Sequence, residues 1–392
     1  MTRDYHKYIS TRAIELQPSG IRKFFDLAAG MEGVISLGVG EPDFITPWNI
    51  RDRSIEALSD GFTSYTANAG LLELREEICA YLNRRFDVTY QPENEVIVTV
   101  GASQALDLTF RTLLNSGDEV LIIEPAFVAY ASLVAMAGGI PVSISTYAEN
   151  GFKVTPELIE ASITERTKAI LICSPNNPTG TCLNKEELTA IAEVVEKHDL
   201  IVVSDEIYAE LTYDQAFTSF SSLPRMFERT ILINGFSKGF AMTGWRLGFI
   251  AAPKELTSIM LKIYQHTTMC APHMLQLGAI EALRNSSEQV EKMQKSYWRR
   301  RNLLVQSLNR IGLDCHMPGG AFYVFPSIKK TGLTSEEFAE NLLKEEKVAV
   351  VPGSAFGPSG EGYVRCSYAT SIEQLQEAVV RMERFLGRYV DR

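Results

Sequence analysis

Short apolar runs alternate with amphipathic stretches through the middle of the chain. The runs predict strands over residues 95–100, 119–125, 141–146, 168–175, 200–206, 230–235 and 246–253. The amphipathic stretches predict helices over residues 101–114, 130–139 and 184–199, the last beginning after Asn184. Apolar strands that alternate with helices are typical of a parallel or mixed sheet covered on both faces. The pattern therefore predicts an α/β fold.

The two ends of the chain follow different patterns. Pro18 breaks the opening segment, so we expect a loop there and a helix from about Ser19. Residues 254–310 read as mostly helical, and beyond them strands are expected at 319–328, 347–357 and 362–370, with helices at 336–346 and 372–390. We predict a large α/β domain over 45–285, a small α/β domain over 286–392, and an N-terminal segment, 1–44, that packs with the small domain.

Candidate functional residues follow the predicted strands where each strand ends. The residues are Gly101, Phe127, Asn177, Asp205 and Lys238. Ligands of open α/β sheets collect at the carboxyl ends of the strands, so we expect these five residues to lie together. As a set they are hard to explain as ordinary loop residues.

The residue types in this set are those that a pyridoxal phosphate site needs. Lys238 lies in a small-residue turn and supplies an amine for a Schiff base, while Asp205 supplies a carboxylate for the pyridine nitrogen. Arg246, eight positions after the lysine, supplies a cation for the phosphate. The sequence therefore indicates a cofactor site at the sheet edge.

Composition narrows the class of protein. The 392 residues are 45% hydrophobic and 22% charged, and the net charge is −10, which argues against a nucleic-acid partner. Six scattered cysteines are expected to be reduced core thiols, and five histidines form no cluster that suggests a metal. No apolar run suggests a signal peptide or a membrane span, so we expect a cytoplasmic protein.

Several motifs in combination resemble those of the fold-type I pyridoxal-phosphate aminotransferases of class I/II. The motifs are SLGVGEPDF, SYTANAGLLELR, VTVGASQAL, SPNNPTG, SDEIYAEL, SKGFAMTGWRLG, GGAFYVF and VRCSYA. The resemblance covers nearly the whole chain. It implies a three-layer αβα large domain with a mostly parallel sheet, pyridoxal 5′-phosphate as cofactor, and a homodimer.

The resemblance implies a role for each cofactor residue. Lys238 would hold the cofactor and move the proton of the substrate's α-carbon, Asp205 would pair with the pyridine nitrogen, and Tyr208 and Asn177 would bond the ring oxygen. Phe127 would stack on the ring. From the residues alone, Asp205 could equally be a helix N-cap, Asn177 a turn residue and Phe127 a core residue.

The phosphate and the substrate would be held by further groups. Arg246 and the helix opening at Ala102, Ser103 and Gln104 would bind the phosphate. Tyr65 would reach the phosphate of the neighbouring subunit. Many relatives carry serine where this chain has Gly235, so Ser237 could supply the missing contact. Arg365 would grip the substrate carboxylate, assisted by the backbone of Gly40. Alternatively, Arg365 forms a surface ion pair.

The implied reaction is ping-pong transfer of an amino group between an L-amino acid and a 2-oxo acid. An aromatic or broad set of donors with 2-oxoglutarate as acceptor is expected, because aspartate-preferring relatives often carry lysine where this chain has Ser103. Aromatic residues expected near the site permit a flat apolar side chain: Phe24, Phe25, Tyr65, Phe127 and Tyr264. The closest resemblance is to aromatic, alanine and acetyl-diaminopimelate aminotransferases.

Two other classes of function stay open. A lyase of the same fold, which cleaves a C–S bond by β-elimination, would use the same residues. An aminotransferase-like effector domain of a transcription regulator would follow a DNA-binding domain. The family pattern begins within the first twenty residues here, and the net charge is acidic, so the regulator is disfavoured. Aspartate, alanine or N-acetyl-diaminopimelate aminotransferase activity stays an alternative.

Overall fold

A seven-stranded sheet forms the centre of the larger part of the molecule. The computed structural model describes residues 5–16 and 30–389, and within them the strand order is β2-β8-β7-β6-β5-β3-β4. Only β8 runs against the others, pairing antiparallel with β2 and β7. The strands are β2 (Val96–Thr99), β3 (Glu119–Glu124), β4 (Ile140–Ser145), β5 (Thr167–Cys173), β6 (Ile201–Asp205), β7 (Thr230–Gly235) and β8 (Gly248–Ala251).

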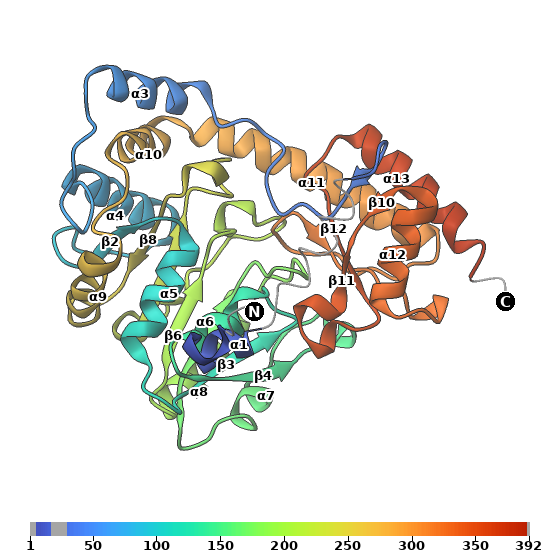
Figure 1. Ribbon diagram of the computed structural model, residues 1–392, viewed down its shortest axis with the longest axis horizontal. Coiled ribbons are helices and arrows are strands. Elements are labelled where there is room, and N and C mark those ends of the chain that lie inside the picture. The colour runs from blue at the N-terminus through green and yellow to red at the C-terminus, as the bar shows by residue number, and fades with distance from the viewer. Residues whose placement is uncertain (1–4, 17–29, 390–392) are drawn as a thin grey trace.

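Helices cover both faces of this sheet (Figure 1). One face packs against α5 (Ala102–Leu113), α6 (Ala129–Met136) and α9 (Lys254–Thr267). The opposite face packs against α4 (Leu72–Phe86), α7 (Pro156–Glu160), α8 (Lys185–Lys197) and α10 (His273–Asn285), with α3 (Trp48–Ser59) outside α10. The prediction of a three-layer αβα arrangement with a mostly parallel sheet is confirmed.

The central strands and helices form where the apolar pattern predicts them. β5 is buried from Ala169 to Cys173 on both faces, which explains its continuous apolar sequence. At α8, the side chain of Asn184 accepts from the amide of Glu187 (2.9 Å), and Glu187 accepts in return from the amide of Asn184 (2.8 Å). This capping box begins the helix at the predicted position.

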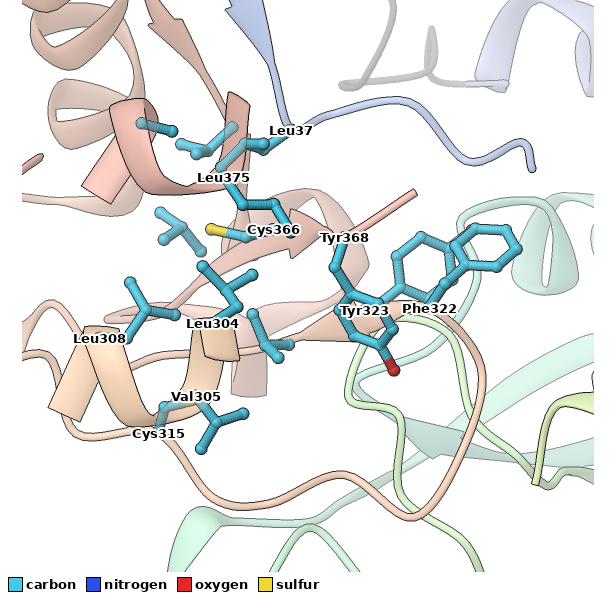
Figure 2. Packing of buried hydrophobic residues seen from close by; sticks show 14 of the residues in the cluster. Leu37, Leu304, Val305, Leu308, Cys315, Phe322, Tyr323, Cys366, Tyr368 and Leu375 are labelled. Carbon is cyan, nitrogen blue, oxygen red and sulfur yellow. The ribbon is translucent and has the colours of Figure 1, made fainter. Parts of the chain in front are cut away.

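The C-terminal part builds a second, smaller core. It contains α11 (Ser287–Arg310), α12 (Ser335–Glu346), α13 (Ile372–Leu386) and an antiparallel sheet of β11 (Val351–Pro352), β12 (Val364–Ser367) and β9 (Tyr323–Val324). Figure 2 shows this core, with leucines on one side and the aromatic rings of Phe322, Tyr323 and Tyr368 on the other. β1 (Ile35–Ser36) pairs in parallel with β10 (Val348–Ala349), which joins the N-terminal segment to the small core. The boundaries at residues 45 and 286 stay predictions.

Several expected elements are shorter than the sequence suggests. Of residues 319–328 only Tyr323–Val324 form a strand, because Ala321 adopts a positive φ of 57° and Pro326 cannot donate to a ladder. Residues 347–357 divide between β10, β11 and a 3-10 turn. At the N-terminus, the loop expected before Pro18 contains a short helix, α1 (Thr11–Glu15), capped by Ser10. The helix expected from Ser19 begins outside the described residues.

The helices α3 and α4 were not predicted from the pattern of apolar positions. In α3 the apolar Trp48, Ile55 and Leu58 are exposed while Ser54 is buried, so its pattern does not separate an inner from an outer face. None of the helices in the described part of the chain combines the length and apolarity needed to span a bilayer. The same residues contain no group of histidine, cysteine and acidic side chains arranged for a metal ion.

Candidate active site

A cavity of about 520 Å³ opens at the carboxyl ends of the large sheet's strands. It brings together most of the residues singled out from the sequence, although they lie up to 325 positions apart, from Gly40 to Arg365. The predicted site residues that line it are Gly40, Ala102, Ser103, Phe127, Asn177, Asp205, Tyr208, Ser237, Lys238, Arg246 and Arg365.

Lys238 is largely buried in the turn that follows β7. Its Nζ donates to the carbonyl oxygen of Gly40 at 2.6 Å. Burial lowers the pKa of the amine to about 8, and the positive charges of Arg365 and Arg246 act in the same direction. Glu41 and Asp205 partly offset these effects. The amine is therefore far easier to deprotonate than an ordinary lysine.

Asp205, the last residue of β6, is a buried carboxylate at the floor of the cavity. Tyr130 donates its hydroxyl hydrogen to Asp205 Oδ2 (2.7 Å), and the amide of Ile207 donates to Oδ1 (3.2 Å). Burial raises the pKa of Asp205, while the bond from Tyr130 opposes that rise. The strand is followed by a 3-10 turn, Ala209–Leu211, rather than by an α-helix. Asp205 is therefore not a helix N-cap. A buried carboxylate with two donors suits a cationic partner.

An anion-binding end of the cavity forms where α5 begins. Ala102 and Ser103 line the cavity from the first turn of the helix, whose free amides attract anions. A side chain at Gly101 (φ 81°) would come within 2.7 Å of Arg246 Nη2, and one at Gly248 within 2.7 Å of the Ala102 nitrogen. The absence of these side chains lets the guanidinium of Arg246 lie beside the helix N-terminus.

Arg365, in β12, forms the opposite end and is only 3% exposed. Its Nη1 donates to Asn177 Oδ1 (2.9 Å) and its Nη2 to the carbonyl of Gly38 (2.6 Å). Its Nε is buried without a hydrogen-bond partner among the described residues. The guanidinium stacks 4.4 Å from the ring centre of Tyr323. A buried cation with a free donor is not a surface ion pair, and it suits a carboxylate ligand.

A few predicted residues do not line the cavity. The Gln104 side chain instead accepts from the amide of Val100 (2.6 Å) and donates to Thr268. Tyr65 is 80% exposed on the surface, and Tyr264 is buried among the residues of α5 and α9. Phe24 and Phe25 lie outside the described residues. A side chain at Gly235 would come within 2.9 Å of Gly248 Cα, so glycine fits the close approach of β7 and β8.

The cavity also contains residues that the sequence analysis does not single out. They include Glu41, Tyr130, Thr243 and Tyr323. Thr243 donates to Glu41 (2.7 Å), and the hydroxyls of Tyr208 and Tyr323 lie 2.9 Å apart. Glu41 and Tyr323 belong to motifs already noted, GEPDF and GGAFYVF, whereas Tyr130 has no signal beyond its position in a helix that follows a strand end.

The cavity combines a largely buried amine and a buried carboxylate at the edge of the αβα sheet with two guanidinium groups, one of them on the small sheet. These are the elements of a pyridoxal-phosphate site. Comparison with known proteins agrees. The model of the family described as aminotransferase class I and II matches residues 32–382. The chain therefore belongs to the class I and II aminotransferases, and it is an enzyme that uses pyridoxal 5′-phosphate.

Similar proteins span nearly the whole chain. YugH of Bacillus subtilis (strain 168) is 68% identical over 97% of this chain and 99% of its own. Its name describes an aminotransferase and gives no substrate. An aspartate aminotransferase of Pyrococcus abyssi is 52% identical over 96% and 98% of the two chains. The crystal structure of an aromatic aminotransferase from Pyrococcus horikoshii has a TM-score of 0.90 and 49% identity, with 94% and 99% covered. The names of these relatives differ in substrate.

The residues present fit the cofactor. The pKa of the Lys238 amine is lowered to about 8, and the carboxylate of Asp205 is buried with no cationic hydrogen-bond partner among the described residues. Ala102, Ser103 and Arg246 line one end of the cavity, where the first turn of α5 and a guanidinium suit a phosphate. The site therefore offers a matching group to each charged part of pyridoxal phosphate.

Proposed function

We propose that this aminotransferase moves the amino group from an aromatic or broad set of L-amino acids to 2-oxoglutarate, with the cavity at Lys238 as its active site. When bound, pyridoxal phosphate supplies an aldehyde that condenses with amines and a ring that takes up negative charge. The roles that follow for the cavity residues rest on the contacts described above.

The large sheet would hold the cofactor. Lys238 Nζ binds it covalently and, once released, accepts and returns the proton of the substrate's α-carbon. Asp205, oriented by Tyr130, holds a proton on the pyridine nitrogen. Tyr208 and Asn177 bond the ring oxygen, and Phe127 stacks on the ring. Phosphate donors are proposed to be Arg246, Ser237 and the backbone amides of Ala102, Ser103 and Gln104.

Arg365 would bind the α-carboxylate that all amino acids and 2-oxo acids share. Its contacts with Asn177 and Gly38 hold the guanidinium in place, and the free Nε adds a donor. The backbone of Gly40 would assist from the facing loop. Because one arginine serves both substrates, donor and acceptor compete for the same binding site.

The choice of amino-acid donor rests on the number of basic side chains that line the cavity. Among the described residues that line it, the basic ones are Lys238, Arg246 and Arg365. The proposed roles use all three, so among the described lining residues no lysine or arginine is left for the second carboxylate of aspartate. Ser103 stands at the entrance of α5 with a small neutral side chain. A donor with a neutral side chain is favoured, and we expect the hydroxyl of Ser103 to meet the distal carboxylate of 2-oxoglutarate.

We also propose a homodimer. Tyr65 is 80% exposed and does not line the cavity of its own chain, as expected of a side chain that reaches the phosphate in the neighbouring subunit. Exposed Ile45 and Trp48 lie nearby in sequence. The proposed place of action is the cytoplasm.

The test of the donor is a spectral titration. The purified enzyme with pyridoxal phosphate receives one L-amino acid at a time without an oxo acid, among them phenylalanine, tyrosine, alanine, aspartate and acetyl-diaminopimelate. Phenylalanine and tyrosine should convert the absorbance of the lysine-bound cofactor to that of its amine form at the lowest concentrations. A clear lead for aspartate would overturn the proposed donor. Release of pyruvate or ammonia would instead indicate the lyase.

Ser103→Lys sharpens this test. The added cation should raise kcat/KM for aspartate relative to phenylalanine by about 5- to 10-fold, because a partly exposed ion pair contributes about 1 kcal/mol. Ser103→Ala serves as the control and should leave the ratio of the two donors unchanged. Equal ratios in the lysine variant and the native enzyme would show that residue 103 does not face the donor's side chain.

A further inference from the structure

Tyr323 enters the cavity from the small sheet, opposite the residues of the large sheet. Its side chain is 1% exposed, and its ring belongs to the aromatic side of the small core (Figure 2). The ring faces the guanidinium of Arg365 at 4.4 Å, and its hydroxyl lies 2.9 Å from that of Tyr208. A side chain at Gly40 would come within 3.0 Å of the same hydroxyl. Tyr323 therefore contacts both the proposed substrate residue Arg365 and the proposed cofactor residue Tyr208.

A single hydrogen bond joins the two buried hydroxyls. Each phenol carries one hydrogen and can accept through its oxygen, so one tyrosine donates and the other keeps a free hydrogen. If Tyr208 donates to the ring oxygen of the cofactor, as in the proposed function, its hydrogen is already used. The hydrogen between the two tyrosines must then come from Tyr323.

We propose that Tyr323 is a positioning residue that acts through Tyr208 and Arg365. Its hydroxyl donates to Tyr208 and thereby directs the Tyr208 hydrogen into the cavity, and its ring supports the guanidinium of Arg365. This inference rests on the proposed function. A hydroxyl that accepts a hydrogen bond becomes a better donor, so Tyr323 strengthens the bond that Tyr208 makes.

The first test uses the colour of the lysine-bound cofactor as a function of pH. A donor to the ring oxygen stabilises the form in which the imine nitrogen has lost its proton and the ring oxygen keeps its charge. Weakening that donor should move the colour change to higher pH. We expect Tyr323→Phe to raise the midpoint by about 0.5 pH unit and Tyr208→Phe to raise it further. In the double variant, the midpoint should equal that of Tyr208→Phe alone.

The second test separates the ring from the hydroxyl. Tyr323→Phe keeps the ring beneath Arg365 and should leave KM for the amino acid nearly unchanged. Tyr323→Leu removes the ring and should raise KM by about 10-fold, because a desolvated cation–π contact is lost. Tyr368→Phe is the control. It removes another buried hydroxyl of the small core, bonded to the Ala321 carbonyl at 3.1 Å, and should change neither the midpoint nor KM.

The outcomes distinguish the inference from the function on which it rests. A shift in Tyr208→Phe without one in Tyr323→Phe would overturn the role of the Tyr323 hydroxyl and leave that of Tyr208 intact. Additive shifts in the double variant would show that Tyr323 does not act through Tyr208, again overturning the inference. If Tyr208→Phe itself causes no shift of the midpoint, the proposed role of Tyr208 in the underlying function is wrong. If KM is unchanged in Tyr323→Leu, the ring of Tyr323 does not support the guanidinium of Arg365.

Discussion

The two walls of the cavity are built differently. The wall with Lys238 and Asp205 rests on strands of four to seven residues in one continuous sheet. The wall with Arg365 and Tyr323 rests on strands of two to four residues in a separate sheet. The side-chain hydrogen bonds between these walls include Arg365 with Asn177 and Tyr208 with Tyr323. The comparison suggests that cofactor binding and substrate binding can be disrupted separately.

Lys238→Met should have the largest effect, because it removes the amine that both halves of the reaction need. We expect the visible absorbance of the lysine-bound cofactor to disappear and turnover to fall by at least about 10³-fold. Absorbance spectra and steady-state kinetics measure the two effects. Retention of full activity would rule out Lys238 as the catalytic amine.

Arg365→Met should disrupt the substrate wall alone. Loss of a buried guanidinium from a carboxylate site lowers affinity by about 2–5 kcal/mol, so kcat/KM should fall by about 30- to 5,000-fold. The lysine-bound cofactor should stay visible. If the variant lost its cofactor but kept substrate affinity, the assignment of the two walls would be reversed.

Arg246→Gln should disrupt the cofactor wall more mildly. A charged hydrogen bond contributes about 1.5–3 kcal/mol, and the amides of α5 remain, so cofactor affinity should fall by about 10-fold or more. Equilibrium dialysis measures this loss. KM for the amino acid, measured at saturating cofactor, should be nearly unchanged. A large rise in KM would place Arg246 on the substrate side.

The smallest effect concerns the stability of the cofactor-free protein. The folded-state pKa of Lys238, about 8, lies below the ordinary value of 10.5, so the unfolded chain binds more protons between these values. Stability should therefore rise with pH from about 8 to 10.5. Relative to Lys238→Met, which lacks this group, the melting temperature of the native chain should gain about 1–3 °C over that range. If the melting temperatures of the two proteins changed with pH in the same way, the buried position of the amine would be contradicted.

The layers of the fold follow from local sequence, whereas the site depends partly on distant contacts. The apolar runs of β5 and β6 predict buried strands, and strand ends predict where Asp205 and Lys238 lie. The order of the strands is a long-range property that these runs do not contain. The hydrogen bond from Tyr130 to Asp205 is also a long-range property, because it joins residues 75 positions apart.

The small sheet was harder to predict for a physical reason. Its strands are two to four residues long, too short for the apolar pattern to show a period. The role of Tyr323 depends on a long-range contact with Tyr208, which lies 115 positions earlier in the chain. The sequence GGAFYVF alone favours a core position for the tyrosine, and the structure shows that it has both a core position and a cavity contact.

Lys238, Arg246 and Arg365 line the cavity of a protein whose net charge is −10. The molecule as a whole therefore repels the anions that its active site attracts. The choice of buffer then becomes part of any measurement on this enzyme. From the proposed roles we expect phosphate and sulfate to compete with the cofactor at the end near Arg246, and small carboxylates such as acetate to compete with substrates at Arg365. Added salt acts in two directions, since it also screens the repulsion that slows the approach of anionic substrates.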